Sequence, residues 1–210
     1  RTQCLNNLRQ LAIGSQVYAT DSRDVLIPAY GGVQPIALDP AIQVEAWATV
    51  GLSIRSNVNS IWSCPNRPLL PQYNSAYNQW GIGYQYYAGI KTWYNNVKAS
   101  GIPAESPQKT STAKAYMMLA ADFVIKFDGV WGRASEVPPS GFINLPAHKA
   151  AASPLPDGGN EVFIDGSARW IKARDMRFIH SWSVSNRELY FWQENLGELE
   201  TERSNLKRIQ

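Results

Sequence analysis

The sequence predicts an α+β fold in which a long N-terminal α-helix packs on a C-terminal antiparallel β-sheet. Three observations lead to this class: an apolar stripe with helical spacing opens the chain, prolines interrupt its middle, and β-favouring runs separated by glycines fill its second half. The 210 residues, of which 44 % are hydrophobic, suffice for one ample core or two small ones. We expect a single domain over residues 1–210.

The N-terminal helix is expected over residues 1–20. Small or apolar side chains recur there at alternating spacings of four and three residues, which aligns them on one helical face. The members of this stripe are Cys4, Leu8, Leu11, Ser15 and Tyr18. Because an apolar stripe must be covered, we expect Leu8, Leu11 and Ser15 to face the sheet.

The rest of the chain divides into three regions, an irregular connecting region, a sheet region and a charged tail, expected at residues 21–76, 77–196 and 197–210. The strongest buried strand signal is the run AYMMLAADFVIKF, which begins at Ala115 and is followed by an Asp-Gly pair. The tail, GELETERSNLKRIQ, is expected to be a frayed helix or disordered.

The connecting region carries the prolines. Pro65, Pro68 and Pro71 stand in SIWSCPNRPLLPQ and oppose regular structure there. Before them, we expect a loop from Gly31 to Asp39 and a short helix that opens at Pro40.

An Asp-Gly pair marks a hairpin in NEVFIDGSARWI, residues 160–171. Asp165 and Gly166 supply the positive backbone dihedrals of a two-residue primed turn, with residues 162–164 running up and 168–171 running back. The alternative treats Asp165 as a working carboxylate in a hydrogen-bonded set with His148 and Asp122.

Catalysis finds little support in the sequence. His148 and His180 are the only histidines, no HExxH spacing joins them, and no serine or cysteine stands in a recognisable nucleophile context. We therefore expect His148 and the Asp165-Gly166 turn to be structural and to hold a long loop, residues 136–160, against the sheet edge.

The charge and the cysteine spacing argue against nucleic-acid binding and against a zinc or redox motif. A formal charge of +3, from 20 basic and 17 acidic residues spread along the chain, gives no basic stripe, so we expect no nucleic-acid partner. Cys4 and Cys64 lack the close spacing of a zinc or redox motif. They are either two buried free thiols or a disulfide that closes a loop of about 60 residues.

An aromatic run extends from Tyr77 to Tyr94. Its exposure decides between a sheet packed under the helix and a binding surface that stacks on sugars or on a protein partner. Three or more exposed rings in one patch would favour binding, and the rings concerned are Trp80, Tyr84, Tyr87, Trp93 and Tyr94.

Three stretches resemble one bacterial family. CLNNLRQLAIGSQVYATDSRDVLIPAY, from Cys4, resembles the stretch that follows the hydrophobic N-terminal segment in type IV pilin-like proteins and type II secretion pseudopilins of the prepilin-type cleavage/methylation class. CPNRP, from Cys64, resembles their mid-chain Cys-Pro element, and HKAAASPLPDGGNEVFIDGSARWI, from His148, resembles the H-X9-DG element of the processing-associated group. Here 16 residues, not nine, separate His148 from Asp165.

The resemblance implies a pilin-like domain whose helix continues from a membrane-embedded segment upstream of Arg1. It implies a non-enzymatic structural subunit of a type II secretion pseudopilus or a type IV pilus-like filament, which assembles through its N-terminal helix. The partners would be copies of itself, other pseudopilins and the inner membrane. The location would be the periplasmic or cell-surface side of the bacterial inner membrane, with the full-length form membrane-anchored.

This location bears on the cysteines and on calcium. An oxidising compartment favours the Cys4–Cys64 disulfide, which we take as a hypothesis. Secretion pseudopilins of the major class hold calcium in a C-terminal loop. The acidic residues of the corresponding region, however, lack the alternate-position spacing of calcium loops. They are Asp157, Glu161, Asp165 and Asp175. We expect no cofactor and keep calcium as the alternative.

Overall fold

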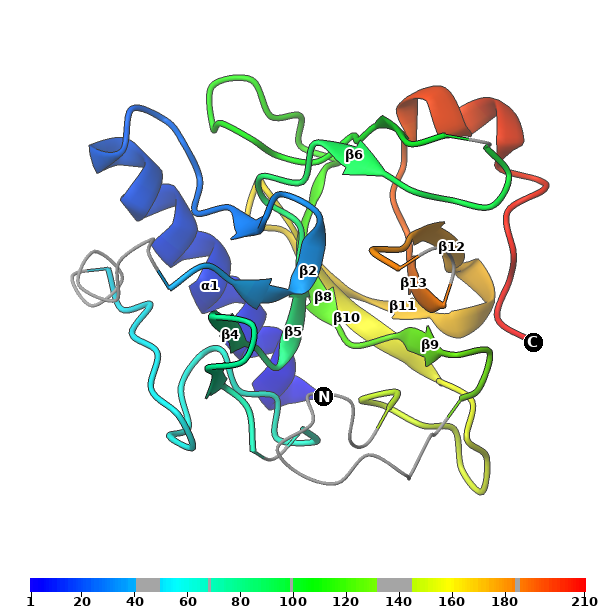
Figure 1. Cartoon of the computed structure of the whole chain (residues 1–210), viewed down its shortest axis with the longest axis horizontal. Helices are drawn as coiled ribbons and strands as arrows, with labels where there is room; N and C mark the ends of the chain where they lie inside the picture. Colours follow the sequence, from blue (N-terminus) through cyan, green and yellow to red (C-terminus); the bar gives the residue numbers. More distant parts are fainter. Residues whose placement is uncertain (41–49, 68, 99, 132–144, 184–185) are drawn as a thin grey trace.

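The computed structural model describes residues 1–40, 50–67, 69–98, 100–131, 145–183 and 186–210. In these ranges one α-helix, α1, is followed by short strands that pair antiparallel in several sheets (Figure 1). The predicted α+β class, with an N-terminal helix laid on antiparallel sheet, is therefore confirmed.

Helix α1 spans Thr2–Asp21 and follows the predicted stripe. Leu8, Leu11 and Ser15 are fully buried, and the helix contacts the strands β8, β10 and β11 described below. Gly14 permits a close approach to the chain beside it, because a methyl group on its Cα would lie 2.6 Å from Leu52 Cδ2. The opposite face of the helix carries the exposed residues Ile13 and Val17.

The central sheet has the strand order β11-β10-β8-β5 and lies beside α1 (Figure 1). Its strands are β5 (Tyr84–Tyr86), β8 (Met118–Asp122), β10 (Gly158–Phe163) and β11 (Ala168–Lys172). Every residue of β5, β8 and β10 is buried, which explains the continuous apolar run around β8. The predicted buried strand is confirmed.

The other sheets flank this centre. An outer sheet has the order β1-β2-β4-β3, a third sheet has the order β12-β13-β9, and β6 pairs with β7. The outer strands are β1 (Ala29–Tyr30), β2 (Gln34–Leu38), β3 (Gln72–Asn74) and β4 (Gln79–Gly81). The remaining strands are β6 (Thr92–Trp93), β7 (Ile102–Pro103), β9 (Ile125–Phe127), β12 (Arg177–His180) and β13 (Arg187–Phe191).

The loop predicted from Gly31 to Asp39 is wrong, because β2 occupies most of it. Its apolar end pairs with β4, where Ala37 opposes Gly81 and Leu38 opposes Trp80. Burial of this end against distant chain overrides the local proline and glycine signals. The helix predicted to open at Pro40 falls on residues 41–49, which lie outside the described residues.

The tail is ordered, contrary to the expectation of a frayed or disordered end. A 3-10 turn, η2 (Gly197–Glu202), buries Leu199, and Leu206 is buried after it. Phe178 N donates to Lys207 O at 2.9 Å, so the tail is fastened to β12. Burial of these two leucines holds the charged segment against the rest of the fold, although its overall composition is polar.

In the part of the chain that the structure describes, no helix has both the length and the apolar character needed to cross a membrane. The largest apolar cluster joins α1 to the central sheet and continues into β9 and β13. A smaller cluster lies around Met176, Phe178 and Tyr190.

Candidate functional site

His148 lies on a loop that folds back on itself at residues 145–157. Asp157 N donates to His148 O at 2.9 Å, and Ala150 N donates to Leu155 O at 2.8 Å. Ala147 N donates to Phe123 O at 3.0 Å, which fixes the loop beside the end of β8. Residues 136–144 of the predicted loop lie outside the described residues.

The loop brings His148 to Asp122, the last residue of β8. His148 Nε2 lies 2.9 Å from Asp122 Oδ2, and both side chains are almost completely buried. The same carboxylate oxygen accepts two hydrogen bonds from Asn160 of β10, from its backbone N at 2.8 Å and from its Nδ2 at 2.7 Å. Asp122 therefore joins the loop to two central strands.

Cys4 and Cys64 meet next to this pair. Their Sγ atoms lie 3.2 Å apart, and both cysteines are buried. As thiols, Cys64 donates to Cys4 and lowers the pKa of Cys4 to about 6, with burial acting in the opposite direction. Donation to Cys4 and burial together raise the pKa of Cys64. In the structure the two cysteines are free thiols. Their proximity is compatible with the predicted bond, whose formation needs an oxidant that takes two electrons from the pair.

The protonation of His148 follows from Asn66. Asn66 Nδ2 donates to Ala147 O at 2.8 Å, which fixes the orientation of the amide, and it also lies 3.0 Å from His148 Nδ1. Because an amide NH₂ only donates, Nδ1 accepts and the ring proton is on Nε2, facing Asp122.

The pKa of His148 points to a different charge state. Burial lowers this pKa, but Asp122 and a Cys4 thiolate outweigh burial and raise it to about 9, which would protonate both ring nitrogens at neutral pH. The hydrogen bond from Asn66 favours the neutral ring, because it requires a lone pair on Nδ1.

The four side chains resemble a metal-ligand set. One donor atom from each of Cys4, Cys64, Asp122 and His148 lies within 4.8 Å of all the others, and Zn²⁺ prefers such sulfur, nitrogen and oxygen donors. The hydrogen bond from Asn66 opposes metal binding, because it leaves the proton, not the lone pair, on Nε2. A cysteine, a histidine and an aspartate also recur in nucleophilic enzymes. Here Cys4 is only 1 % exposed, so a substrate in solution cannot reach its sulfur in this structure.

Asp165 does not join this cluster. Asp122 and His148 lie beside Asn160 near the start of β10, whereas Asp165 follows the end of that strand. Asp165 Oδ1 accepts hydrogen bonds within its own turn, from Ser167 N at 2.9 Å and from Ser167 Oγ at 2.6 Å. The alternative hydrogen-bonded set therefore reduces to His148 and Asp122.

The turn at Asp165-Gly166 is a hairpin turn, but its predicted type is wrong. Gly166 has φ +83°, whereas Asp165 is not among the residues with positive φ. Gly166 N donates to Phe163 O and Phe163 N donates to Ser167 O, each at 2.9 Å. This is a three-residue loop, a type I turn followed by a left-handed glycine. The extra residue keeps the apolar Ile164 in the turn and buried.

The four acidic residues considered for calcium lie on separate elements. Asp157 forms an ion pair with Arg1, and Asp175 lies in the 3-10 turn η1 (Ala173–Asp175) next to Arg174. Glu161 is buried in β10 and accepts a hydrogen bond from Trp192 N at 2.8 Å. Burial raises the pKa of Glu161 well above its usual value.

The aromatic run from Tyr77 to Tyr94 is largely core. Tyr84, Tyr87 and Trp93 are fully buried, so three of the five rings weighed for a binding patch are inaccessible. Tyr94 is exposed and Trp80 is half-buried. The open patch that the binding alternative required from these residues is not formed.

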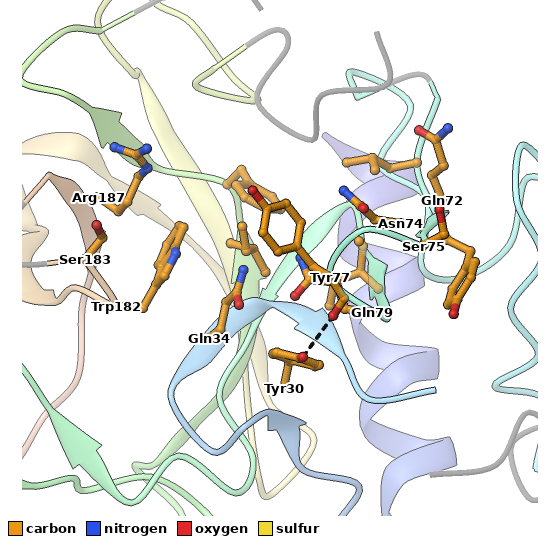
Figure 2. Close-up of a pocket in the computed structure, with 16 residues that line it drawn as sticks. Tyr30, Gln34, Gln72, Asn74, Ser75, Tyr77, Gln79, Trp182, Ser183 and Arg187 are labelled. Atoms are coloured by element: carbon orange, nitrogen blue, oxygen red, sulfur yellow. Dashed lines mark hydrogen bonds between the residues drawn. The ribbon is translucent and has the colours of Figure 1, made fainter. Parts of the chain in front are cut away.

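A separate cleft of about 620 Å³ opens over the outer sheet. Figure 2 shows Tyr77 and Gln34 projecting into it between Trp182 and Arg187 on one side and Gln72 on the other. Tyr30 Oη donates to Tyr77 O at 2.9 Å. The cleft lies over β2, β3 and β4, two of which fall in the region that the sequence assigned to irregular chain.

Sequence reasoning missed two groups of residues. Asn66 and Asn160 position His148 and Asp122 but carry no local signal. Asn66 stands in a loop, where asparagine usually indicates only a turn, and Asn160 lies in β10. Tyr73 and Gln72 of the cleft follow Pro71 closely, and the prolines there predicted irregular chain instead of a strand. The signal that could have found them is the short run QYN at 72–74 followed by QW at 79–80, because two such runs separated by a turn are typical of a hairpin.

No protein family, curated protein or solved structure matches the chain. The class of protein that can be stated from the fold is therefore an α+β domain with its N-terminal helix on antiparallel sheet.

Proposed function

We propose that the chain is a non-enzymatic structural subunit of a type II secretion pseudopilus or a type IV pilus-like filament, and that it assembles through its N-terminal helix. Its partners are copies of itself and other pseudopilins. Its place is the periplasmic or cell-surface side of the bacterial inner membrane. The resemblance of the segment from Cys4 to Tyr30 to pilin-like proteins supports this proposal.

The observation that carries the proposal is a pair of exposed apolar residues on α1. Ile13 is 61 % exposed and Val17 is 48 % exposed, although the opposite face of the same helix is fully buried. The two residues are four positions apart, so their side chains lie one above the other. Exposed apolar surface on a helix is stabilised when another helix covers it.

A filament requires a contact of this kind. A heterologous contact that repeats without closing generates an open helical assembly and needs no active site. The interior of the chain fits such a role, because Cys4, Asp122 and His148 are buried and contact one another within the fold. The competing proposal, a binding module built on the aromatic run, is weakened by the burial of Tyr84 and Trp93.

Cross-linking in cells of the source bacterium tests the proposal. The chromosomal gene is changed to encode Ile13→Cys, and a short membrane-permeable cross-linker that carries one maleimide and one amine-reactive ester is added to intact cells, so that the new thiol of one copy can be joined to a lysine of the next. Cys4 and Cys64 are buried, so the new thiol is the accessible one. We expect a ladder of dimers, trimers and higher multimers that contain the chain.

The matched control places the thiol on the exposed Arg174, away from the helix. Arg174→Cys is expected to give no ladder. If Ile13→Cys yields only monomer under conditions in which a maleimide dye labels it, the helix does not mediate assembly and the proposal is wrong.

A further inference from the structure

We propose that the cleft over the outer sheet is a binding site for a neutral oligosaccharide. This goes beyond the filament subunit proposed above and does not depend on whether the chain polymerises. The cleft has the size of a small-ligand site, since pockets for such ligands measure roughly 300–1,000 Å³ and this one measures about 620 Å³.

Aromatic rings form one part of the cleft. Tyr77 is 67 % exposed and Tyr73 is 40 % exposed, and both line it. Burial is the usual state of aromatic rings in this chain, as Tyr84, Tyr87 and Trp93 show. Two open tyrosines on adjacent elements therefore form an available platform. Tyrosine combines an apolar ring face with a polar hydroxyl, which suits the C–H face and the hydroxyl rim of a sugar ring.

The ring of Tyr73 and the backbone of Tyr77 are held in place before any ligand binds. Tyr73 Oη donates to Asn78 Oδ1 at 2.6 Å, and the Tyr73 ring lies 5.4 Å from the ring of Trp80. The backbone of Tyr77 is fixed by the hydrogen bond from Tyr30 Oη. Pre-ordered side chains lose little conformational entropy on binding, which favours weak-contact ligands such as sugars.

Side-chain amides form the other part of the cleft. Gln34, Gln72 and Gln79 line it, and their side chains form no hydrogen bond with any residue that the structure describes. A primary amide both donates and accepts, as a sugar hydroxyl does. Three such amides beside two aromatic rings match a ligand rich in hydroxyl groups.

Charge excludes other ligand classes. Arg187 is the only charged residue among those that line the cleft, and it forms an ion pair with Asp128 and lies over the ring of Phe127. A phosphorylated or acidic ligand would require a cation that is not already paired with a carboxylate, and among the described residues of this lining Arg187 is paired with Asp128. A lipid or an apolar peptide would leave the three amides unpaired and desolvated, which is costly.

Titration calorimetry on the 210-residue chain tests the proposal with cellohexaose, xylohexaose, mannohexaose and maltohexaose as separate probes, and with hexagalacturonate as a charged probe. We expect at least one neutral hexasaccharide to bind. Tyr77→Ala should weaken that binding about tenfold or more, because the stacking ring is removed. Tyr77→Phe keeps the ring and should stay within about twofold of the parent.

The matched control is Tyr94→Ala, because Tyr94 is 45 % exposed but does not line the cleft. It should leave affinity unchanged. A second variant, Gln79→Ala, should weaken binding through lost hydrogen bonds, and circular dichroism establishes that each variant is folded. Three results would overturn the proposal: no binding of any neutral probe, binding that Tyr77→Ala leaves intact, or binding of hexagalacturonate alone. Failure of Ile13→Cys to give cross-linked multimers would contradict only the filament proposal and would leave the oligosaccharide site untouched.

Discussion

The central sheet and the outer sheet treat the same kinds of residue in opposite ways. In the central sheet every residue of β5, β8 and β10 is buried, including Tyr84 and Tyr86. In the outer sheet no residue of β3 or β4 is buried, although both strands carry aromatic and amide side chains. Aromatic content therefore does not reveal a binding surface. What matters is whether the strand that carries the ring lies beneath other chain.

From this contrast we expect the central region to determine the stability of the fold and the region around the cleft to determine ligand binding. Changes in the central region should alter the free energy of unfolding, and changes around the cleft should leave it nearly unchanged. The cysteines, α1 and the hairpin of β10 and β11 belong to the first region. Tyr77 and the glutamines of β2, β3 and β4 belong to the second.

The largest effect is expected from the cysteines. If Cys4 and Cys64 are bonded, reduction should lower the free energy of unfolding by about 4 kcal/mol, because the bond closes a loop of about 60 residues in the unfolded chain. Urea unfolding with and without a reductant measures this loss. Thiol titration of the unreduced, denatured protein should find no free thiol, and two free thiols would rule the bond out.

Leu8→Ala should lower the free energy of unfolding by about 2 to 5 kcal/mol, since its side chain is fully buried between α1 and the sheet. Ile13→Ala on the exposed face of the same helix is the matched control and should change it by less than about 0.5 kcal/mol. Thermal and urea unfolding of the isolated chain measure both. An equal, small effect of the two changes would show that α1 is not docked.

His180 fastens the outer sheet to the rest of the molecule. Its Nε2 lies 2.7 Å from Val33 O and its Nδ1 accepts from Tyr94 N at 3.2 Å. Burial lowers the pKa of His180 to about 4. Between pH 6.5 and pH 4 the unfolded chain binds a proton that the folded chain does not, so this histidine makes the fold less stable as the pH falls.

The loss through His180 should reach about 3 kcal/mol over that range. His180→Asn should therefore show a weaker decline of unfolding free energy between pH 6.5 and pH 4 than the parent. The buried Glu161, whose raised pKa acts in the opposite direction, is common to both proteins and cancels in the difference. Parallel pH profiles for parent and variant would refute the role given to His180.

Gly166→Val should destabilise the fold by about 1 to 2 kcal/mol, because Gly166 has φ +83° and a β-branched residue is strained there. No atom within 4 Å would meet an added Cβ, so the effect is one of backbone conformation alone. Gly166→Asn is the control, since asparagine tolerates this region better. Equal melting temperatures for glycine and valine at this position would contradict the assigned turn.

The smallest effect is expected at the cleft. Tyr77→Ala should change the free energy of unfolding by less than about 0.5 kcal/mol, as is usual for an exposed position. A loss as large as that of Leu8→Ala would mean that Tyr77 supports the fold, and the division between the two regions would fail. The same urea titration serves for both variants.

The sequence predicts best where local pattern and tertiary packing agree. The stripe of Leu8, Leu11 and Ser15 defines α1, and the apolar run around β8 defines the central strand, because burial on one or both faces leaves a periodicity in the sequence. The loop predicted over β2 failed for the opposite reason. Strand β2 pairs with β4, more than forty residues away, as well as with the nearby β1, and the distant pairing leaves little local trace.

The candidate site was predictable only in its parts. His148 and Asp122 were named from their chemistry, but the loop that joins them is held by the side chain of Asn66, whose hydrogen bonds to Ala147 and His148 are distant in sequence. Asp165 was grouped with them because it follows His148 in the chain. The order of residues along β10 separates it from them, and that order becomes informative only when the register of the strands is known.

The packing of α1 on β10 has a consequence for synthesis. Gln16 Nε2 donates to Ile164 O at 2.5 Å, across 148 residues of chain. At roughly 5–20 residues per second on the ribosome, α1 waits about 8 to 30 s for its strands to emerge. During that interval the apolar stripe of the helix lacks β10 and β11, two of the strands that it contacts. The packing of α1 against the central sheet is therefore completed only after β10 and β11 have been translated.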